Sequence, residues 1–414
     1  MLIPSAMAPG DDRIRRYYLF RAVTSFSLWM PFWTLWAYIN LDSYFLLTVV
    51  DVGFWTTMIV LQIPAGLIGD KYGRRIVLFI GEVLVAIGVL SFGLSTELWE
   101  LFASNIVWAT GICFAVSGDT PFVYDTLLEL RRAKEFIGIM ARGWAVTAVA
   151  NAIACVFGGV MVQWIWPDRL DLTLIFSAVI ALLGSLTIVT LKEPKVHRTE
   201  FTSYTKQLKD GVHRIFTTKA ILVLILFQIV IEIATYVMAV FRSVYMNEDL
   251  MLNYFQIGAF VAAFTVFGGV AAAQAGKIEA RLGEKNSLLF LLLTIIGSFA
   301  VVFLVASPIA IIVQFPIYAV SYLQSPIVGG YINKRVDSSH RSTVVALSSM
   351  IFTVFLTAVE LPSGWLANEF GTRETMALLA VAVAPIGLYL ILLWRRELDA
   401  ESKRKKRIRT LRQL

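Results

Sequence analysis

The sequence predicts an all-α polytopic membrane protein with twelve transmembrane helices. We expect two pseudo-symmetric six-helix bundles, each built as a 3+3 inverted repeat. Three observations predict this class: the composition, the number of long apolar segments and a turn motif that recurs. Apolar residues make up 58% of the chain and charged residues 16%, whereas soluble domains are about half apolar and a quarter charged. So little charged surface cannot cover the chain in water, and we expect helices in a bilayer, where they satisfy their own backbone hydrogen bonds.

Twelve segments are long and apolar enough to cross the hydrocarbon core, which takes about 20 helical residues. They lie near residues 17–40, 46–68, 76–95, 98–127, 136–163, 172–191, 220–246, 254–274, 286–306, 309–332, 342–367 and 373–394. Most connections between them are short, so we expect successive spans to be antiparallel neighbours. Residues 1–12 are polar and few, unlike a signal peptide, and the first span is expected to be retained.

The long connection at residues 192–219 divides the spans into two groups of six. Its apolar residues recur at helical spacing and predict a short amphipathic helix on the membrane surface: Phe201, Tyr204, Leu208, Val212 and Ile215. We therefore predict an N-terminal bundle at 1–191, a cytoplasmic linker at 192–219, a C-terminal bundle at 220–394 and a basic tail at 395–414.

The distribution of basic residues predicts the orientation. With both termini in the cytoplasm, only Arg169 and Arg373 of the 36 Lys and Arg residues fall in outward connections. Three more lie within spans: Arg21, Arg142 and Arg242. All the others lie on the cytoplasmic side, as the positive-inside rule requires. We expect a multi-pass protein of the cytoplasmic membrane, whose basic tail either fixes topology alone or also binds anionic lipid.

A turn motif recurs near the two ends of the chain. Ile63–Arg75 reads IPAGLIGDKYGRR and Leu361–Arg373 reads LPSGWLANEFGTR. The span count places the two copies on opposite sides of the membrane, so they are inverted equivalents. Related glycines at Gly159 and Gly276 extend the pattern to four three-span units. Two parallel halves, each with an inverted repeat, are typical of transporters whose substrate site lies at the midplane.

The first copy also carries a more specific pattern between the second and third spans. Gly66, Asp70, Gly73, Arg74 and Arg75 form a G-x-x-x-D-x-x-G-R-R loop, which resembles the signature loop of the major facilitator superfamily. The resemblance covers essentially the whole chain in length, span number and central linker. It implies that Asp70 and Arg74 latch the outward-open state, and that the first span of each three-span unit lines a central cavity.

The signature loop also has a physical logic of its own. Gly66 is expected to let its helix approach a neighbour closely. Asp70 is expected near the N-terminus of the third span, where the helix dipole favours a carboxylate. In the second half, Ala280 stands where the family's acid would be, so a gate symmetrical between the halves is not expected.

Ionisable residues inside spans are costly and are functional candidates by default. Glu232 lies at the centre of 220–246, with Gln228 and Tyr236 four residues away on the same helical face. It could carry a coupling proton or pair with a cationic substrate; the alternative is a carboxyl hydrogen-bonded within the bundle. Asp119, two residues before Pro121, is the second candidate for proton coupling.

The other ionisable residues lie nearer the ends of their spans. Arg21 is a cavity candidate that could instead extend to the cytoplasmic face. Asp125 and Arg142 flank one short loop and are expected to form a structural or gating salt bridge, which Glu82 could join. Arg242 is expected in water at the outer end of its span.

Aromatic residues supply the remaining cavity candidates. Trp29 and Trp33 share one face of the first span, and the tenth span adds four more candidates: Gln314, Tyr318, Tyr322 and Gln324. Such a wall suits an amphipathic or cationic organic solute. The alternative is the interfacial aromatic belt, which fits mid-span tryptophans poorly.

These features favour a secondary active transporter that works by alternating access, is coupled to protons and exports an amphipathic or cationic compound. Alternatives are proton-coupled or facilitative nutrient uptake and, in another class, a receptor or channel. No nucleophile or metal cluster occurs in the spans, no phosphate-binding loop occurs, and Cys113 and Cys155 fit no disulfide or metal pattern. We therefore expect no enzyme activity and no cofactor. The expected partners are a small-molecule substrate, protons and membrane lipids, without nucleic acid, and the expected state is a monomer.

Overall fold

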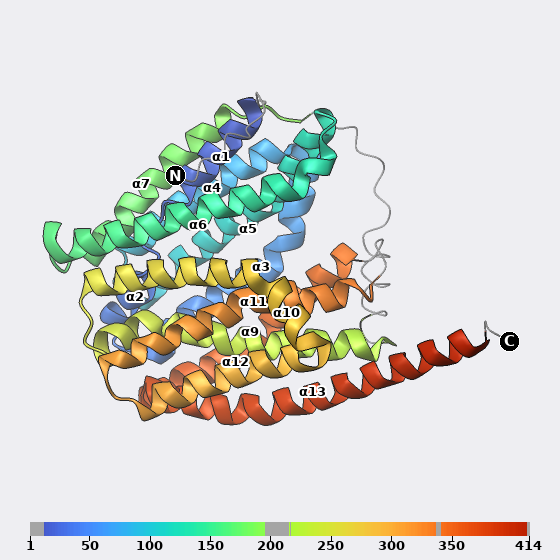
Figure 1. Ribbon diagram of the computed structural model, residues 1–414. Helices are drawn as coiled ribbons and strands as arrows, with labels where there is room; N and C mark the ends of the chain where they lie inside the picture. The colour runs from blue at the N-terminus through green and yellow to red at the C-terminus, as the bar shows by residue number, and fades with distance from the viewer. Residues whose placement is uncertain (1–11, 195–214, 216, 337–340, 412–414) are drawn as a thin grey trace. The chain divides into compact units, whose positions relative to one another are not determined.

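The computed structural model describes residues 12–194, 215, 217–336 and 341–411, and the regular structure in this part of the chain is helical (Figure 1). Contacts divide the protein into two compact units. The first lies within Met1–Thr199 and also takes Asn253–Ala263; the second lies within Glu200–Leu252 and Phe264–Leu414.

The first unit contains the helices of the first six predicted spans. They are α1 Asp12–Thr24, α2 Trp33–Leu41, α3 Tyr44–Tyr72, α4 Arg74–Leu94, α5 Leu98–Glu129, the 3-10 turn η1 Ala133–Glu135, α6 Phe136–Val160, the π turn η2 Met161–Ile165 and α7 Leu170–Val189. The later helices are α9 Lys219–Val244, the π turn η3 Tyr245–Asp249, α10 Tyr254–Leu304, the 3-10 turn η4 Pro308–Val313, α11 Gln314–Asn333, α12 Arg341–Phe370 and α13 Thr372–Leu411.

The first predicted span is not one continuous helix. We predicted a single helix over residues 17–40, but α1 ends at Thr24 and α2 begins at Trp33. Between them the backbone forms tight turns, with Phe26 N–H donating to the Val23 carbonyl at 3.1 Å. Pro31 falls in this stretch, has no N–H to donate and cannot continue a regular helix. Ser25, Ser27 and Trp29 of this break line a cavity in the unit.

Two predicted spans are joined in one helical element. α10 has 51 residues and turns at Gly283, whose φ of 70° lies in the left-handed region that glycine adopts readily. Within the described residues, ten helices are long and apolar enough to cross a membrane. Counting α10 twice and the broken α1–α2 pair once accounts for the twelve predicted spans, and the all-α fold class is confirmed.

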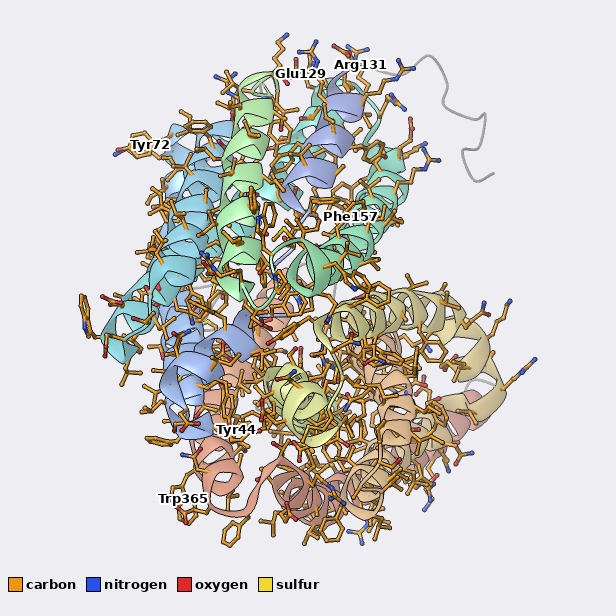
Figure 2. All side chains as sticks on the ribbon, turned by 90° about the vertical axis from the view of Figure 1, so that its left-hand side faces the viewer. Tyr44, Tyr72, Glu129, Arg131, Phe157 and Trp365 are labelled. Carbon is orange, nitrogen blue, oxygen red and sulfur yellow. The ribbon has the colours of Figure 1, made fainter. Side chains whose placement is uncertain are left out.

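Large apolar side chains are exposed on both units. Tyr72, Phe157 and Trp365, labelled in Figure 2, are each more than half exposed. A soluble protein rarely shows so many apolar groups to water. The membrane-spanning helices explain them, because these surfaces then face lipid.

Close packing of α4 on α5 depends on glycine. A Cβ on Gly81 would lie 2.5 Å from the Ala115 backbone nitrogen, and one on Gly88 would lie 2.4 Å from that of Trp108. No larger residue fits without moving a helix. These glycines therefore bring the two helices together and set the position of Trp108 against α4.

Two predicted segments need separate mention. The proposed amphipathic helix of the linker lies outside the described residues, except for Ile215. The predicted basic tail continues α13 as a helix to Leu411. At about 1.5 Å per residue, 40 residues span about 60 Å, roughly twice the hydrocarbon core, so α13 extends beyond the bilayer.

Candidate functional site

The first unit encloses a cavity of about 260 Å³. Its charged lining residues are Arg21 on α1, Glu82 on α4 and Asp119 on α5. Its aromatic lining residues are Phe20 on α1, Trp29 in the break between α1 and α2, Trp108 on α5 and Trp144 on α6. The α1 break therefore supplies part of the cavity wall that a continuous helix would not.

Helical periodicity aims these charged side chains inward. Tyr17 and Phe20 on α1 are buried in the core of the unit, and Arg21 follows at the edge of that buried face. On α4, Glu82 lies four residues from buried Leu78, which places both on the same face. On α5, Asp119 shares a face with Phe122, three residues further along the helix.

Arg21 and Asp119 form an ion pair inside the unit, with Arg21 Nη1 3.3 Å from Asp119 Oδ2. Both side chains are largely buried, at 15% and 10% exposed. The Arg21 guanidinium also lies 4.9 Å from the Trp144 ring centre, and the Tyr17 hydroxyl lies close to Asp119. The structure thus joins two candidates that the sequence treated separately, and Arg21 does not extend to the membrane surface.

Glu82 lies beside this pair. It is 9% exposed, faces the same cavity and is near enough to Arg21 and Asp119 to interact electrostatically. The sequence marked Glu82 only as a neighbour of the Asp125–Arg142 network. The charged residues near it are instead Arg21 and Asp119 of the cavity. The sequence shows only that Glu82 is a carboxyl inside an apolar span, and this does not reveal which way its side chain faces.

The tryptophans of the first span have different positions. Trp29 lines the cavity and meets Trp108 edge-on, with ring centres 4.5 Å apart. Trp33 also contacts Trp108, at 6.4 Å, and Phe92 at the same distance. Trp33 is not among the described residues that line the cavity, so it supports the aromatic wall from behind.

The second unit encloses a smaller cavity of about 190 Å³. Glu232 and Gln228 on α9 line it, as do Asn333 on α11 and Ser348 and Ser349 on α12. The Gln228 side chain hydrogen-bonds to Glu232. The predicted pairing of these two side chains on one face of the span is therefore present, whereas Tyr236 is not among the described residues that line this cavity.

The four candidates from the tenth predicted span lie elsewhere in the second unit. Gln314 and Gln324 are buried. Tyr318 packs against Arg242, whose guanidinium lies 4.4 Å from the ring centre and donates to the Tyr318 hydroxyl. Tyr322 stacks on Tyr318 at 6.4 Å. Arg242, which we expected in water, is half-buried because this aromatic surface covers it.

The signature loop forms a compact ion network in the first unit. The chain turns at Gly73, with φ 111°, and Arg74 pairs with Asp70, four residues earlier on the other side of that turn. The N-terminus of α4 receives Glu193, whose carboxylate accepts the N–H groups of Arg74 and Arg75 at 2.7 and 2.8 Å. Glu193, from the end of α7, thus occupies the helix-dipole position that we had expected for Asp70.

Two further expectations for this region differ from the structure or stay open. A Cβ on Gly66 would meet no atom within 4 Å, so the close approach predicted there is not made; Gly69 is the crowded position instead. Arg142 lies close to Tyr18 and Glu135. The Asp125–Arg142 salt bridge remains a prediction.

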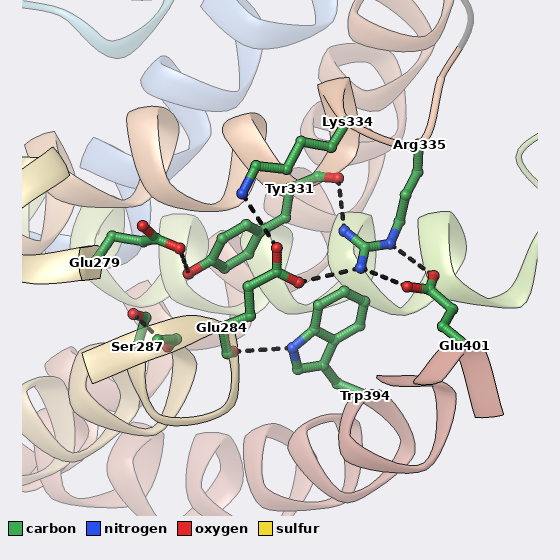
Figure 3. Close-up of polar contacts among 9 residues, drawn as sticks. Glu279, Glu284, Ser287, Tyr331, Lys334, Arg335, Trp394 and Glu401 are labelled. Carbon is green, nitrogen blue, oxygen red and sulfur yellow. Dashed lines mark hydrogen bonds and ion pairs between the residues drawn. The ribbon is translucent and has the colours of Figure 1, made fainter. Parts of the chain in front are cut away.

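The equivalent turn of the second unit carries its own ion network (Figure 3). Glu284, directly after the Gly283 turn, accepts from Arg335 at 3.1 Å and from Lys334 at 3.2 Å. Arg335 also pairs with Glu401 of α13 at 2.9 Å. Burial lowers the pKa of Arg335, but its hydrogen bonds to these carboxylates outweigh burial and raise that pKa above its ordinary value. This turn thus carries a carboxylate at position 284, four residues after Ala280.

A family model described as Major Facilitator Superfamily matches residues 18–359 and 243–413. Multidrug resistance protein 1 of Bacillus subtilis (strain 168) is 26% identical over 193 residues, 46% of this chain and 46% of that protein. Multidrug resistance protein MdtG of Erwinia billingiae (strain Eb661) is 23% identical over 291 residues, 65% of each protein. The chain therefore spans about half to two thirds of the length of these relatives.

Solved structures resemble the fold over nearly the whole chain. The nucleoside transporter NupG superposes with a TM-score of 0.77 at 12% identity, covering 93% of this chain and 99% of that one. A bacterial homologue of the human lysosomal transporter Spinster gives 0.75 at 13% identity, covering 92% and 96%. At these identities the likeness shows the fold alone.

Proposed function

The chain belongs to the Major Facilitator Superfamily, a family of transporters, and on that premise we propose that it is a proton-coupled secondary transporter that exports an amphipathic or cationic organic compound by alternating access. The observation that carries the proposal is that each unit encloses a cavity with at least one carboxyl on its wall. Carboxyls inside membrane spans typically mark proton or substrate pathways.

Glu232 and Asp119 are the proposed proton carriers. Glu232 is half-buried, faces its cavity and has no basic residue among the described residues that line that cavity. Asp119 is held by Arg21. A carboxyl in such a site binds a proton when the cavity is closed and releases it when water enters. An exchange of protons for a cation at these groups would couple the two fluxes.

Export is favoured over nutrient uptake because both relatives described above are named multidrug resistance proteins. The cavity chemistry agrees, since aromatic rings and carboxyls together suit organic cations. The proposed substrate partners are thus lipophilic or substituted ammonium compounds.

Proteoliposomes test the proposal, with ethidium as the organic cation. An acidic lumen should drive ethidium inward as protons leave, and an ionophore that removes the pH gradient should abolish accumulation. Unlabelled ethidium on the far side should accelerate exchange of labelled ethidium, because a carrier shows such stimulation and a channel does not.

Glu232→Gln separates coupling from binding. The variant should lose gradient-driven accumulation yet keep ethidium exchange, while Glu369→Gln, at an exposed position on α12, should behave as the unaltered protein. Uphill accumulation by Glu232→Gln at the normal rate would remove Glu232 from the coupling role. Flux without stimulated exchange would favour the channel alternative.

A further inference from the structure

The cavity of the first unit has an excess of negative charge. Arg21, Glu82 and Asp119 are the charged residues among the described residues that line it. Two carboxyls therefore face one guanidinium. The cavity wall is otherwise neutral, so with both carboxyls ionised the site holds one negative charge that the unit does not balance.

The geometry identifies Glu82 as the group left over. Arg21 is committed to Asp119 at 3.3 Å and stacks against Trp144. Glu82 makes no ion pair with any described residue, although it is 9% exposed. Arg21 is near enough to interact with Glu82 but is paired with Asp119. A buried charge that is incompletely balanced is unfavourable, so such a site favours the uptake of a proton or a cation.

The neutral part of the wall suits an organic cation better than a metal ion. Trp29 and Trp108 present aromatic rings at the cavity, and aromatic surfaces attract ammonium groups. The described residues contain no group of three or more His, Cys, Asp and Glu side chains that could hold a metal.

Unsatisfied polar atoms in the same wall point to a ligand with a polar end. Trp108 is 4% exposed, and its indole N–H has no hydrogen-bond acceptor within the described part of the chain. The buried Asn151 Oδ1 likewise has no donor there, and Asn151 lines the cavity too. Buried polar atoms are usually paired, so these two would gain a partner if the polar end of a bound molecule reached them.

We propose that this cavity binds a small substituted ammonium compound, with Glu82 as its counter-ion, Trp29 and Trp108 as the wall for its methyl groups, and the Trp108 N–H as a donor to its polar end. This inference rests on the proposed function and names the substrate class of the first unit's cavity. A volume of about 260 Å³ lies just below the range of about 300–1,000 Å³ typical of small-molecule sites. It therefore admits a small cation or one end of a larger one.

Three probes of nearly equal shape test the charge preference by calorimetry on the purified full-length protein. Choline carries a positive charge, 3,3-dimethylbutanol is its neutral isostere, and 3,3-dimethylbutanoate has the same branched end with a negative charge. We expect choline to bind at least about tenfold more tightly than the neutral isostere, and the anion not to bind. Equal binding of choline and the alcohol, or preference for the anion, would overturn the proposal.

Two variants and one control locate the site. Glu82→Gln keeps the side-chain shape and should weaken choline binding about tenfold or more, while leaving binding of the alcohol unchanged. Trp108→Phe should weaken both, because it removes the N–H that meets the shared hydroxyl. Glu369→Gln removes an equivalent charge from an exposed position and should change neither; melting curves check that all variants are folded. Unaltered choline binding by folded Glu82→Gln would exclude this residue as the counter-ion.

The binding measurement also separates this inference from the proposed function. If choline does not bind but ethidium exchange is stimulated in liposomes, the Glu82 site is wrong and the transporter stands. If choline binds through Glu82 and no flux of ethidium or choline follows, the site stands and the proposed export fails.

Discussion

The carboxylate of Glu193 should stabilise the first unit by closing the N-terminus of α4. It accepts two backbone N–H groups at 2.7 and 2.8 Å, in a position where helix N-termini favour negative charge. Glu193→Ala removes both acceptors and the charge. A lost N-terminal cap costs about 1 kcal/mol, and up to about 2 kcal/mol in good geometry. Because Glu193 is half-buried, we expect a loss of about 1–2 kcal/mol in the free energy of unfolding.

Thermal unfolding of the purified protein measures this loss. For a unit of about 200 residues, 1 kcal/mol corresponds to about 2–4 °C in Tm, so Glu193→Ala should lower Tm by about 2–8 °C. Glu193→Gln keeps one oxygen acceptor and should fall between the two proteins. The neighbouring exposed Lys192 provides a control, and Lys192→Ala should leave Tm unchanged. A Tm for Glu193→Ala equal to that of Lys192→Ala would refute the capping role.

Three further substitutions test other parts of the molecule. Asp70→Asn weakens the proposed latch and should increase closure of the protein on its outward side. A cysteine placed at the outward end of α2 should then be alkylated more slowly. An unchanged alkylation rate would count against the latch. Gly88→Ala forces a Cβ into the backbone of α5 and should lower the free energy of unfolding by about 1–3 kcal/mol. Gly138 has open space around it, so Gly138→Ala should be tolerated. Equal Tm values for the two variants would contradict the packing argument. Arg335→Gln breaks the ion pair with Glu401 and should lower the free energy of unfolding by about 2 kcal/mol. The end of α13 should then be cleaved earlier in limited proteolysis. Unchanged cleavage would mean that the ion pair does not hold this helix in place.

Local sequence was sufficient for most of the helices and for the turn between α3 and α4. The length of an apolar segment predicts a membrane span because the thickness of the bilayer sets the length that a spanning helix needs. The α3–α4 turn was predictable from the signature pattern and from Gly73, whose φ of 111° other residues avoid. In each case the physical cause acts within a few residues. The ion pair of Asp70 with Arg74 across that turn was not predicted.

The first span shows where local reasoning failed. Its apolar composition predicts one helix, and Pro31 marked the place of the break only weakly, because helices in membranes tolerate proline where neighbours satisfy the freed backbone groups. Here the chain turns over residues 25–32 instead. Packing of Trp29 against Trp108, a residue far along the sequence, accompanies that turn.

By itself, the sequence determined the helical class, the span number, the family loop and the presence of carboxyls inside the membrane. Only the tertiary structure decided which of those charged groups meet. Arg21 reaches Asp119 98 positions later, and Glu193 closes a helix that begins 119 positions before it. Such pairings depend on the rotation and depth of each packed helix, which no local pattern specifies. For the same reason, the sequence alone shows that Glu82 is a charged residue within an apolar span. Only the packing of α1, α4 and α5 shows that it lines the cavity.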